Sequence, residues 1–122
     1  MRSKRNIGEQ YENLAADYLG KHGCRIIARN FRCRRGEIDL VVQENRTVAF
    51  VEVKYRTNDS FGSAISMVTA AKQRKLIYTA QIFLQQNSKL SSLDARFDVV
   101  GITPTANGNE LEYEWIRGAF TT

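Results

Sequence analysis

Apolar positions recur with helical spacing in two stretches of the chain. The first stretch predicts three turns of helix from the spacing of Ile7, Tyr11, Leu14, Ala15, Tyr18 and Leu19. Asn6 can cap the start of this helix, and Gly23 can end it in the left-handed conformation. His22, the only histidine, is expected to cap the last turn rather than to act in catalysis. A second helix is expected from a cap at Thr69 to about Asn87, with a buried stripe of Leu76, Ile77, Ala80, Phe83 and Leu84.

Period-two patterns predict five strands, at residues 25–29, 36–42, 50–56, 96–102 and 111–116. Residues 58–66 and 88–94 are expected to be loops. Asn107-Gly108 marks the turn between the last two strands, and Pro104, the only proline, falls in the same connection. The order is helix, three strands, helix, two strands. A helix between the third and fourth strands indicates a crossover, so we expect an α/β fold with a mixed sheet.

The second and third strands predict a hairpin with charge on one face. Matching the apolar faces across the hairpin groups Ile38, Leu40 and Val42 with Ala49, Val51 and Val53. Asp39, Glu52 and Lys54 then share the other face, and a loop at residues 44–47 places Asp39 opposite Glu52. Carboxylates about 5 Å apart across a ladder repel one another, so a cation is expected between them. The candidates are a divalent metal and the Lys54 ammonium, and a solvated charged face is the structural alternative.

The hard oxygen ligands of this hairpin favour Mg²⁺ or Mn²⁺ over zinc, because neither Cys nor His lies nearby. Glu12 lies about 100° around the first helix from the centre of its apolar stripe. A glutamate in that position can reach a cleft beside the sheet, and a plain surface role is its alternative.

A length of 122 residues is expected to form one domain, residues 1–122. No apolar run approaches the roughly 18 residues that span a bilayer, and no hydrophobic signal region follows the basic N-terminus. We therefore expect no membrane partner and a cytoplasmic location. Cys24 and Cys33 lack metal-ligand spacing and are expected to be free thiols in a reducing compartment, with a disulfide as the alternative.

The net charge of +5 is unevenly distributed along the chain. Residues 21–36 carry six cations and no acid, and Arg outnumbers Lys twelve to six in the whole sequence. Guanidinium groups suit bidentate contacts with phosphate, so a nucleic-acid partner is expected, with DNA and RNA both open. The candidate contacts are Arg29, Arg32, Arg34 and Arg35, with Lys72, Gln73, Arg74 and Lys75 at the start of the second helix. A merely basic protein is the alternative.

Two blocks of residues resemble a known nuclease superfamily. Asp39, followed after a hairpin by Glu52-Val53-Lys54, is similar to the Asp…Glu-x-Lys core of the PD-(D/E)XK superfamily. The YraN-like bacterial family within it is similar over about residues 6–120. That match is carried by Gly8-x-x-Tyr11-Glu12, Arg29-Asn30-Phe31-Arg32-Cys33-Arg34, Gly36-Glu37-Ile38-Asp39-Leu40, Phe50-Val51-Glu52-Val53-Lys54, Phe61-Gly62, Val68-Thr69-x-x-Lys72-Gln73-Arg74 and Arg96-Phe97-Asp98-Val99-Val100.

The resemblance implies a restriction-endonuclease-like three-layer core with a mixed sheet of about five strands. It further implies that Asp39, Glu52 and the main-chain carbonyl of Val53 bind Mg²⁺ or Mn²⁺, and that Lys54 orients or activates water. Glu12 would match an acidic residue on the first helix of archaeal Holliday junction resolvases, which cut branched DNA as homodimers. Ile38 stands where the superfamily has proline before the aspartate, which is a small departure.

The sequence is compatible with three functions. The first is a metal-dependent nuclease acting on linear or branched DNA. The second is a non-catalytic nucleic-acid-binding adaptor on the same fold, which would be free to lose Asp39, Glu52 and Lys54. The third is a protein-interaction module that uses the face of the last strand carrying Tyr113 and Trp115.

Overall fold

The computed structural model describes residues 4–56 and 68–121, with side chains from residue 8 onward. The elements are α1 (Lys4–Lys21), β1 (Arg25–Cys33), β2 (Gly36–Glu44), β3 (Thr47–Tyr55), α2 (Ala70–Gln86), the 3₁₀ helix η2 (Ser88–Ser92), β4 (Asp94–Pro104) and β5 (Leu111–Phe120). The loop predicted at residues 58–66 and the Phe61-Gly62 pair lie outside the described residues.

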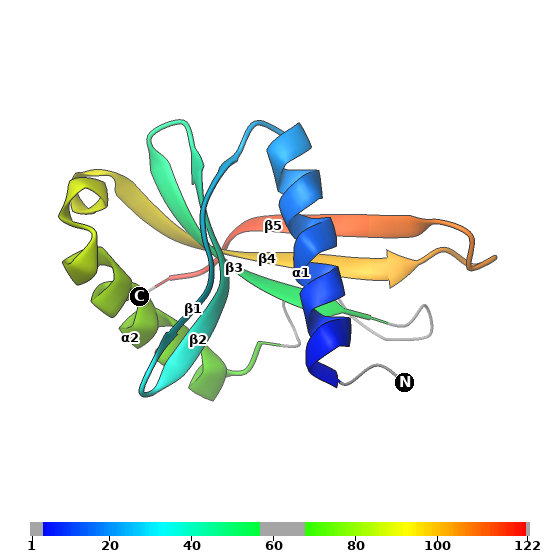
Figure 1. The fold of residues 1–122 in the computed structure, drawn as a ribbon, viewed down its shortest axis with the longest axis horizontal. Coiled ribbons are helices and arrows are strands. Elements are labelled where there is room, and N and C mark those ends of the chain that lie inside the picture. Colours follow the sequence, from blue (N-terminus) through cyan, green and yellow to red (C-terminus); the bar gives the residue numbers. More distant parts are fainter. Residues whose placement is uncertain (1–3, 57–67, 122) are drawn as a thin grey trace.

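The five strands form one sheet in the order β1-β2-β3-β4-β5 (Figure 1). The β3–β4 pair is parallel and the other three pairs are antiparallel. The predicted α/β class, the order of elements and the mixed sheet are therefore confirmed, and the arrangement is consistent with a nuclease-like core.

The two helices cover different sides of the sheet. Buried residues of α1, including Ala15 and Leu19, pack with Leu40, Val42 and Val51. Those of α2 pack with a second set that includes Ile38, Val41, Val48, Phe50 and Val99. Because alternate residues of β2 and β3 belong to the two sets, both faces of these central strands are buried. The middle parts of these two strands are consequently apolar on both faces, as in Leu40–Val42 and Val48–Val51.

Several predicted boundaries hold. Gly23 has φ 94° after α1, as a left-handed stop requires, and the Nδ1 of His22 lies 2.7 Å from the Tyr18 carbonyl oxygen. Thr69 caps α2, because its Oγ1 accepts a hydrogen bond from the Lys72 backbone N–H at 3.2 Å. Gly108 has φ 75° in the β4–β5 turn, as the Asn-Gly signal predicts. The two cysteines are free thiols.

Other boundaries were wrong. Helix α1 already begins at Lys4, so Asn6 lies inside it instead of capping it. Strand β1 continues to Cys33, four residues beyond its predicted end at residue 29, because Phe31 pairs with Ile38. Residues 88–92 form a 3₁₀ helix instead of a loop, and β4 extends to Pro104, whose ring ends the strand.

The hairpin register matches the prediction, but the alternation does not. Pairs Leu40↔Val51 to Glu44↔Thr47 enclose a two-residue turn in place of the expected four-residue loop. Ile38, however, packs on the α2 side, whereas Leu40 packs on the α1 side. The alternation of β2 therefore changes phase at Asp39. At the same level of β1, Asn30 adopts φ 53° between the pairs Arg29↔Leu40 and Phe31↔Ile38, which keep the same register.

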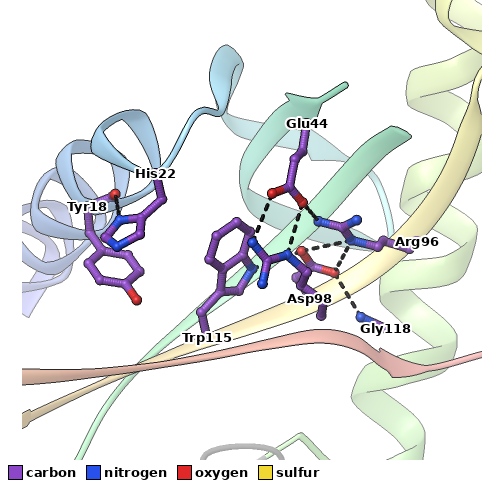
Figure 2. Close-up of polar contacts among 8 residues, drawn as sticks. Tyr18, His22, Glu44, Arg96, Asp98, Trp115 and Gly118 are labelled. Carbon is purple, nitrogen blue, oxygen red and sulfur yellow. Dashed lines mark hydrogen bonds and ion pairs between the residues drawn. The ribbon is translucent and has the colours of Figure 1, made fainter. Parts of the chain in front are cut away.

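The other end of β2 holds a polar network that joins β2, β4 and β5 (Figure 2). Asp98 is fully buried and accepts hydrogen bonds from Arg96, Trp115 and the Gly118 backbone N–H. Glu44 accepts from Arg96 at 2.6 Å and from Arg117 at 2.8 Å. Because the buried charges meet opposite charges and N–H donors, this cluster holds β5 in place beside β4 and β2.

None of the described helices is both long enough and apolar enough to cross a membrane.

Candidate metal centre

Carboxylates from α1, β2 and β3 meet near the start of β2. Glu12, Glu37 and Asp39 each place one carboxylate oxygen within 4.8 Å of the other two. The Glu52 carboxyl group lies close enough to Asp39 for Asp39 to raise its pKa. Asp39 is held in place by the Val53 backbone N–H, which donates to its Oδ2 at 2.8 Å. Three acidic side chains from α1 and β2 therefore form one group, and Glu52 of β3 lies beside its member Asp39.

The backbone irregularity of β1 contributes directly to this arrangement. Asn30 sits opposite Asp39 in the left-handed conformation that asparagine tolerates better than most residues. The Asn30 side chain also lowers the pKa of Glu12, against the larger effects of burial and of Asp39. One residue therefore interrupts the regular backbone beside Asp39 and acts on the helix carboxylate.

The crowding of carboxylates changes their protonation. Burial raises the pKa of Glu52 to about 8, the neighbouring Asp39 raises it as well, and Lys72 and then Lys54 oppose the change. Burial and the charge of Asp39 raise the pKa of Glu12 to about 7, against the hydrogen bond from Asn30. Without a cation, part of the negative charge of this cluster is therefore removed by protons at neutral pH.

The donor set fits a hard divalent cation. Mg²⁺ takes oxygen ligands at about 2.1 Å in an octahedron, so opposite ligands lie about 4 Å apart, close to the spacing within this group. One oxygen each of Glu12 and Glu52 is buried and has no hydrogen-bond partner, although the Glu52 atom forms an ion pair with Lys72 at 3.4 Å. A cation bound by these carboxylates would satisfy such atoms.

The structure places the predicted site residues as follows. Glu12 and Asp39 belong to one carboxylate group with Glu37, and Glu52 lies beside Asp39. Val53 contacts Asp39 through its backbone N–H, and its carbonyl remains the ligand that the resemblance implies. Lys54 is half-buried and acts on Glu52 through its charge, but the ion pair to Glu52 comes from Lys72 of α2.

Two members of the cluster were missed by sequence reasoning. Glu37 precedes Asp39 by two positions, so strict alternation alone places both on one face, and this signal was available. Asn30 was noted only as part of a family motif. No spacing rule would have placed it opposite Asp39, because its effect depends on the β1–β2 pairing.

The candidate phosphate-binding cations separate into groups. Arg32, Arg35, Lys72 and Lys75 line one depression together with Glu37, which also forms an ion pair with Arg32 at 3.3 Å. Arg34 and Arg74 are exposed, on the β1–β2 turn and on α2. Arg29 donates instead to Asn13 of α1, and the Gln73 side chain donates to the Val68 carbonyl. The segments predicted as two patches thus meet beside the carboxylates.

The β5 face proposed for partner binding is partly covered by the chain itself. Tyr113 stacks on Tyr18 of α1 with ring centroids 4.5 Å apart, and the Arg117 guanidinium lies 3.5 Å from the Trp115 ring centroid. These aromatic side chains are therefore used to attach the end of α1 to the sheet.

Comparison with known proteins places the chain in a family. UPF0102 proteins from Vibrio campbellii and Vibrio parahaemolyticus are 51% and 49% identical over 120 and 119 residues, in each case 98% of this chain and 95% of the relative. The structure of Pyrococcus furiosus SfsA in complex with Ca²⁺ shares 17% identity at a TM-score of 0.35, over 94% of this chain and 64% of that one. The model of "Uncharacterised protein family UPF0102" matches residues 11–102, so the chain belongs to this family.

Proposed function

We propose that this protein is a metal-dependent nuclease of the PD-(D/E)XK superfamily that hydrolyses phosphodiester bonds of DNA in the cytoplasm. The observation that carries the proposal is the convergence of Glu12, Glu37 and Asp39 within 4.8 Å, with Glu52 against Asp39. A row of cations borders the same carboxylates, which suits a polyanionic substrate. The resemblance to Holliday junction resolvases extends the proposal to branched DNA and to a homodimer.

Each residue has a definite role in this proposal. Asp39 and Glu52, with Glu12 and Glu37 beside them, would hold Mg²⁺ or Mn²⁺ through hard oxygen atoms. When bound, the cation supplies positive charge that offsets the charge developing on the phosphate. Lys54, two residues beyond Glu52 on β3, orients the attacking water. The N–H of Val53 keeps Asp39 in place through the reaction.

The test is cleavage of a DNA panel by the whole protein. Linear, flapped, nicked and four-way substrates, with an RNA control, are incubated with and without Mn²⁺. We expect cleavage that requires the metal and falls by orders of magnitude in Glu52→Gln, while Lys54→Ala loses about 10² to 10⁴ in rate and little in binding. The matched control is Lys89→Ala, an exposed lysine on η2, which should cut like the wild type.

One observation favours the adaptor instead. Raised pKa values at Glu12 and Glu52, together with the Lys72 ion pair, let the carboxylate cluster exist without a metal. A wild-type protein that binds DNA but cuts none of the substrates with any metal would establish the adaptor and refute the nuclease.

A further inference from the structure

Two adjoining depressions lie where the β1–β2 turn meets α2. The first, of about 510 Å³, is lined by Arg32, Arg35, Glu37, Lys72 and Lys75, among others. The contact between these elements is close, because a Cβ on Gly36 would lie 2.6 Å from the Thr79 Oγ1. Figure 1 shows the tip of the β1–β2 hairpin beside α2. Basic side chains from two distant segments are thereby held over one surface.

The second depression, of about 240 Å³, shares two residues with the first. Arg35 and Lys75 line both, and Arg74, Ala71 and Tyr78 complete the second. We call the two together the α2 groove. Because Arg35 and Lys75 line both depressions, the two lie side by side on one surface, with Glu37 lining the first and Tyr78 the second.

Tyr78 gives this groove an aromatic surface. Its side chain is 38% exposed, whereas the apolar stripe of α2 faces the sheet. The Arg35 guanidinium lies 5.1 Å from the ring centroid, a cation–π distance. A tyrosine ring and a guanidinium plane are both surfaces on which a nucleobase stacks.

Cations together with an exposed aromatic ring favour single-stranded over duplex nucleic acid. Lysines and arginines bind the phosphates of any strand, paired or unpaired. An aromatic ring on the surface of a helix reaches the face of a base only if that base is unstacked from a duplex. A groove that offers both kinds of contact is matched to an unpaired strand.

We infer that the α2 groove binds a single-stranded segment of nucleic acid, with a phosphate among Arg35, Lys72 and Lys75 and a base stacked on Tyr78. The inference rests on the proposed function and gives the form of its substrate, an unpaired strand leading to the site of cleavage. Two residues that connect the α2 groove with the carboxylates support a strand that runs from one to the other. Glu37 belongs both to the groove and to the carboxylate group, and Lys72 lines the groove while pairing with Glu52.

The test measures binding without cleavage. A short single-stranded DNA containing the fluorescent base 2-aminopurine is titrated with the whole protein in EDTA, and anisotropy and fluorescence are recorded. Tyr78→Leu is expected to weaken binding about 5- to 100-fold and to abolish quenching of the fluorescent base, because stacking on one aromatic ring is lost. Tyr78→Phe keeps the ring and should stay within about twofold of the wild type. The blunt duplex of the same sequence should bind Tyr78→Leu and the wild type alike.

A pair of arginines provides the control for charge. Arg35 and Arg46 are both exposed and lie in two-residue hairpin turns at opposite ends of β2. Arg35→Gln should weaken single-strand binding and lower the salt slope by about 0.7, whereas Arg46→Gln should leave both unchanged. Equal effects of the two substitutions, or Tyr78→Leu binding and quenching like the wild type, would overturn the inference. Either result leaves metal-dependent cleavage untouched, so the two proposals fail separately.

Discussion

Two residues with special backbone requirements set the geometry around the carboxylates. Asn30 adopts φ 53° in β1 opposite Asp39, and its side chain lowers the pKa of Glu12. Gly36 lets the β1–β2 turn approach α2 so closely that no side chain fits between them. Neither residue bears charge, yet the first arranges the acidic cluster and the second brings the basic side chains of the α2 groove together.

Gly36→Ala is predicted to destabilise the fold by about 1 to 3 kcal/mol, because its methyl group would overlap the Thr79 hydroxyl and press on the Lys75 carbonyl. The Gly36→Ala substitution should cost less stability in a Thr79→Ala background, where the hydroxyl is absent, than in the wild type. Urea unfolding measures each free energy. The control is Gly20→Ala, where nothing lies within 4 Å and the helix should tolerate or favour alanine. Equal effects at Gly36 and Gly20 would show that the turn has room to move.

At the scale of elements, the two ends of β2 have opposite electrostatic character. Near its start, acidic groups face one another and burial raises the pKa values of Glu12 and Glu52. At its last residue, Glu44 meets two guanidinium groups, and the hydrogen bonds from Arg117, then those from Arg96, lower its pKa to about 2. One end is therefore suited to receive a cation, while the other already contains its cations and stabilises the sheet.

The Glu44 network predicts a pH dependence of stability. Its pKa is lower in the folded protein than its ordinary value of 4.5, so its contribution is complete above about pH 4.5 and is lost as the pH falls toward 2. When the pH falls from 6 to 3, the free energy of unfolding should fall in both proteins. The fall should be about 1 to 3 kcal/mol smaller in Glu44→Gln than in the wild type. Urea unfolding at both pH values checks this, with exposed Glu112→Gln as control. Parallel losses in wild type and Glu44→Gln would contradict the assignment.

At the scale of the whole molecule, the candidate metal centre connects separate parts of the fold. Glu12 comes from α1, Glu37 and Asp39 come from β2, and Glu52 comes from β3. Lys72, near the start of α2, forms an ion pair with Glu52. A cation shared by these groups would link the helix on one side of the sheet to its central strands. Binding and stability are then coupled, because the unfolded chain has no such site.

Mn²⁺ is therefore predicted to stabilise the folded protein. At a concentration one hundred times the dissociation constant, the gain is about 2.7 kcal/mol and appears as a higher melting temperature. Asp39→Asn should remove most of this gain, whereas Glu110→Gln, an exposed acid beside β5, should keep it. Thermal unfolding with and without Mn²⁺ measures both, and calorimetric titration supplies the affinity. Equal shifts in the two variants would locate the bound metal elsewhere.

The local pattern determined most of the architecture. Apolar spacing specified both helices and the five strands, and residue type specified the Thr69 cap and the stop at Gly23, because these features depend on residues a few positions apart. Pairing of apolar faces also specified the β2–β3 register, since a slip of one residue would expose the buried side. The nearness of Asp39 to Glu52 followed from that register alone.

Only the tertiary structure decided which other groups join that pair. Glu12, Asn30 and Lys72 reach it from α1, β1 and α2, and no spacing along the chain encodes those distances. The change of phase at Asp39 likewise lies opposite Asn30 of the neighbouring strand, and strict alternation misplaced Ile38. Local periodicity determines elements because it acts within one segment of chain. The sets of charges that could do chemistry form only when several segments pack together, and their composition depends on that packing.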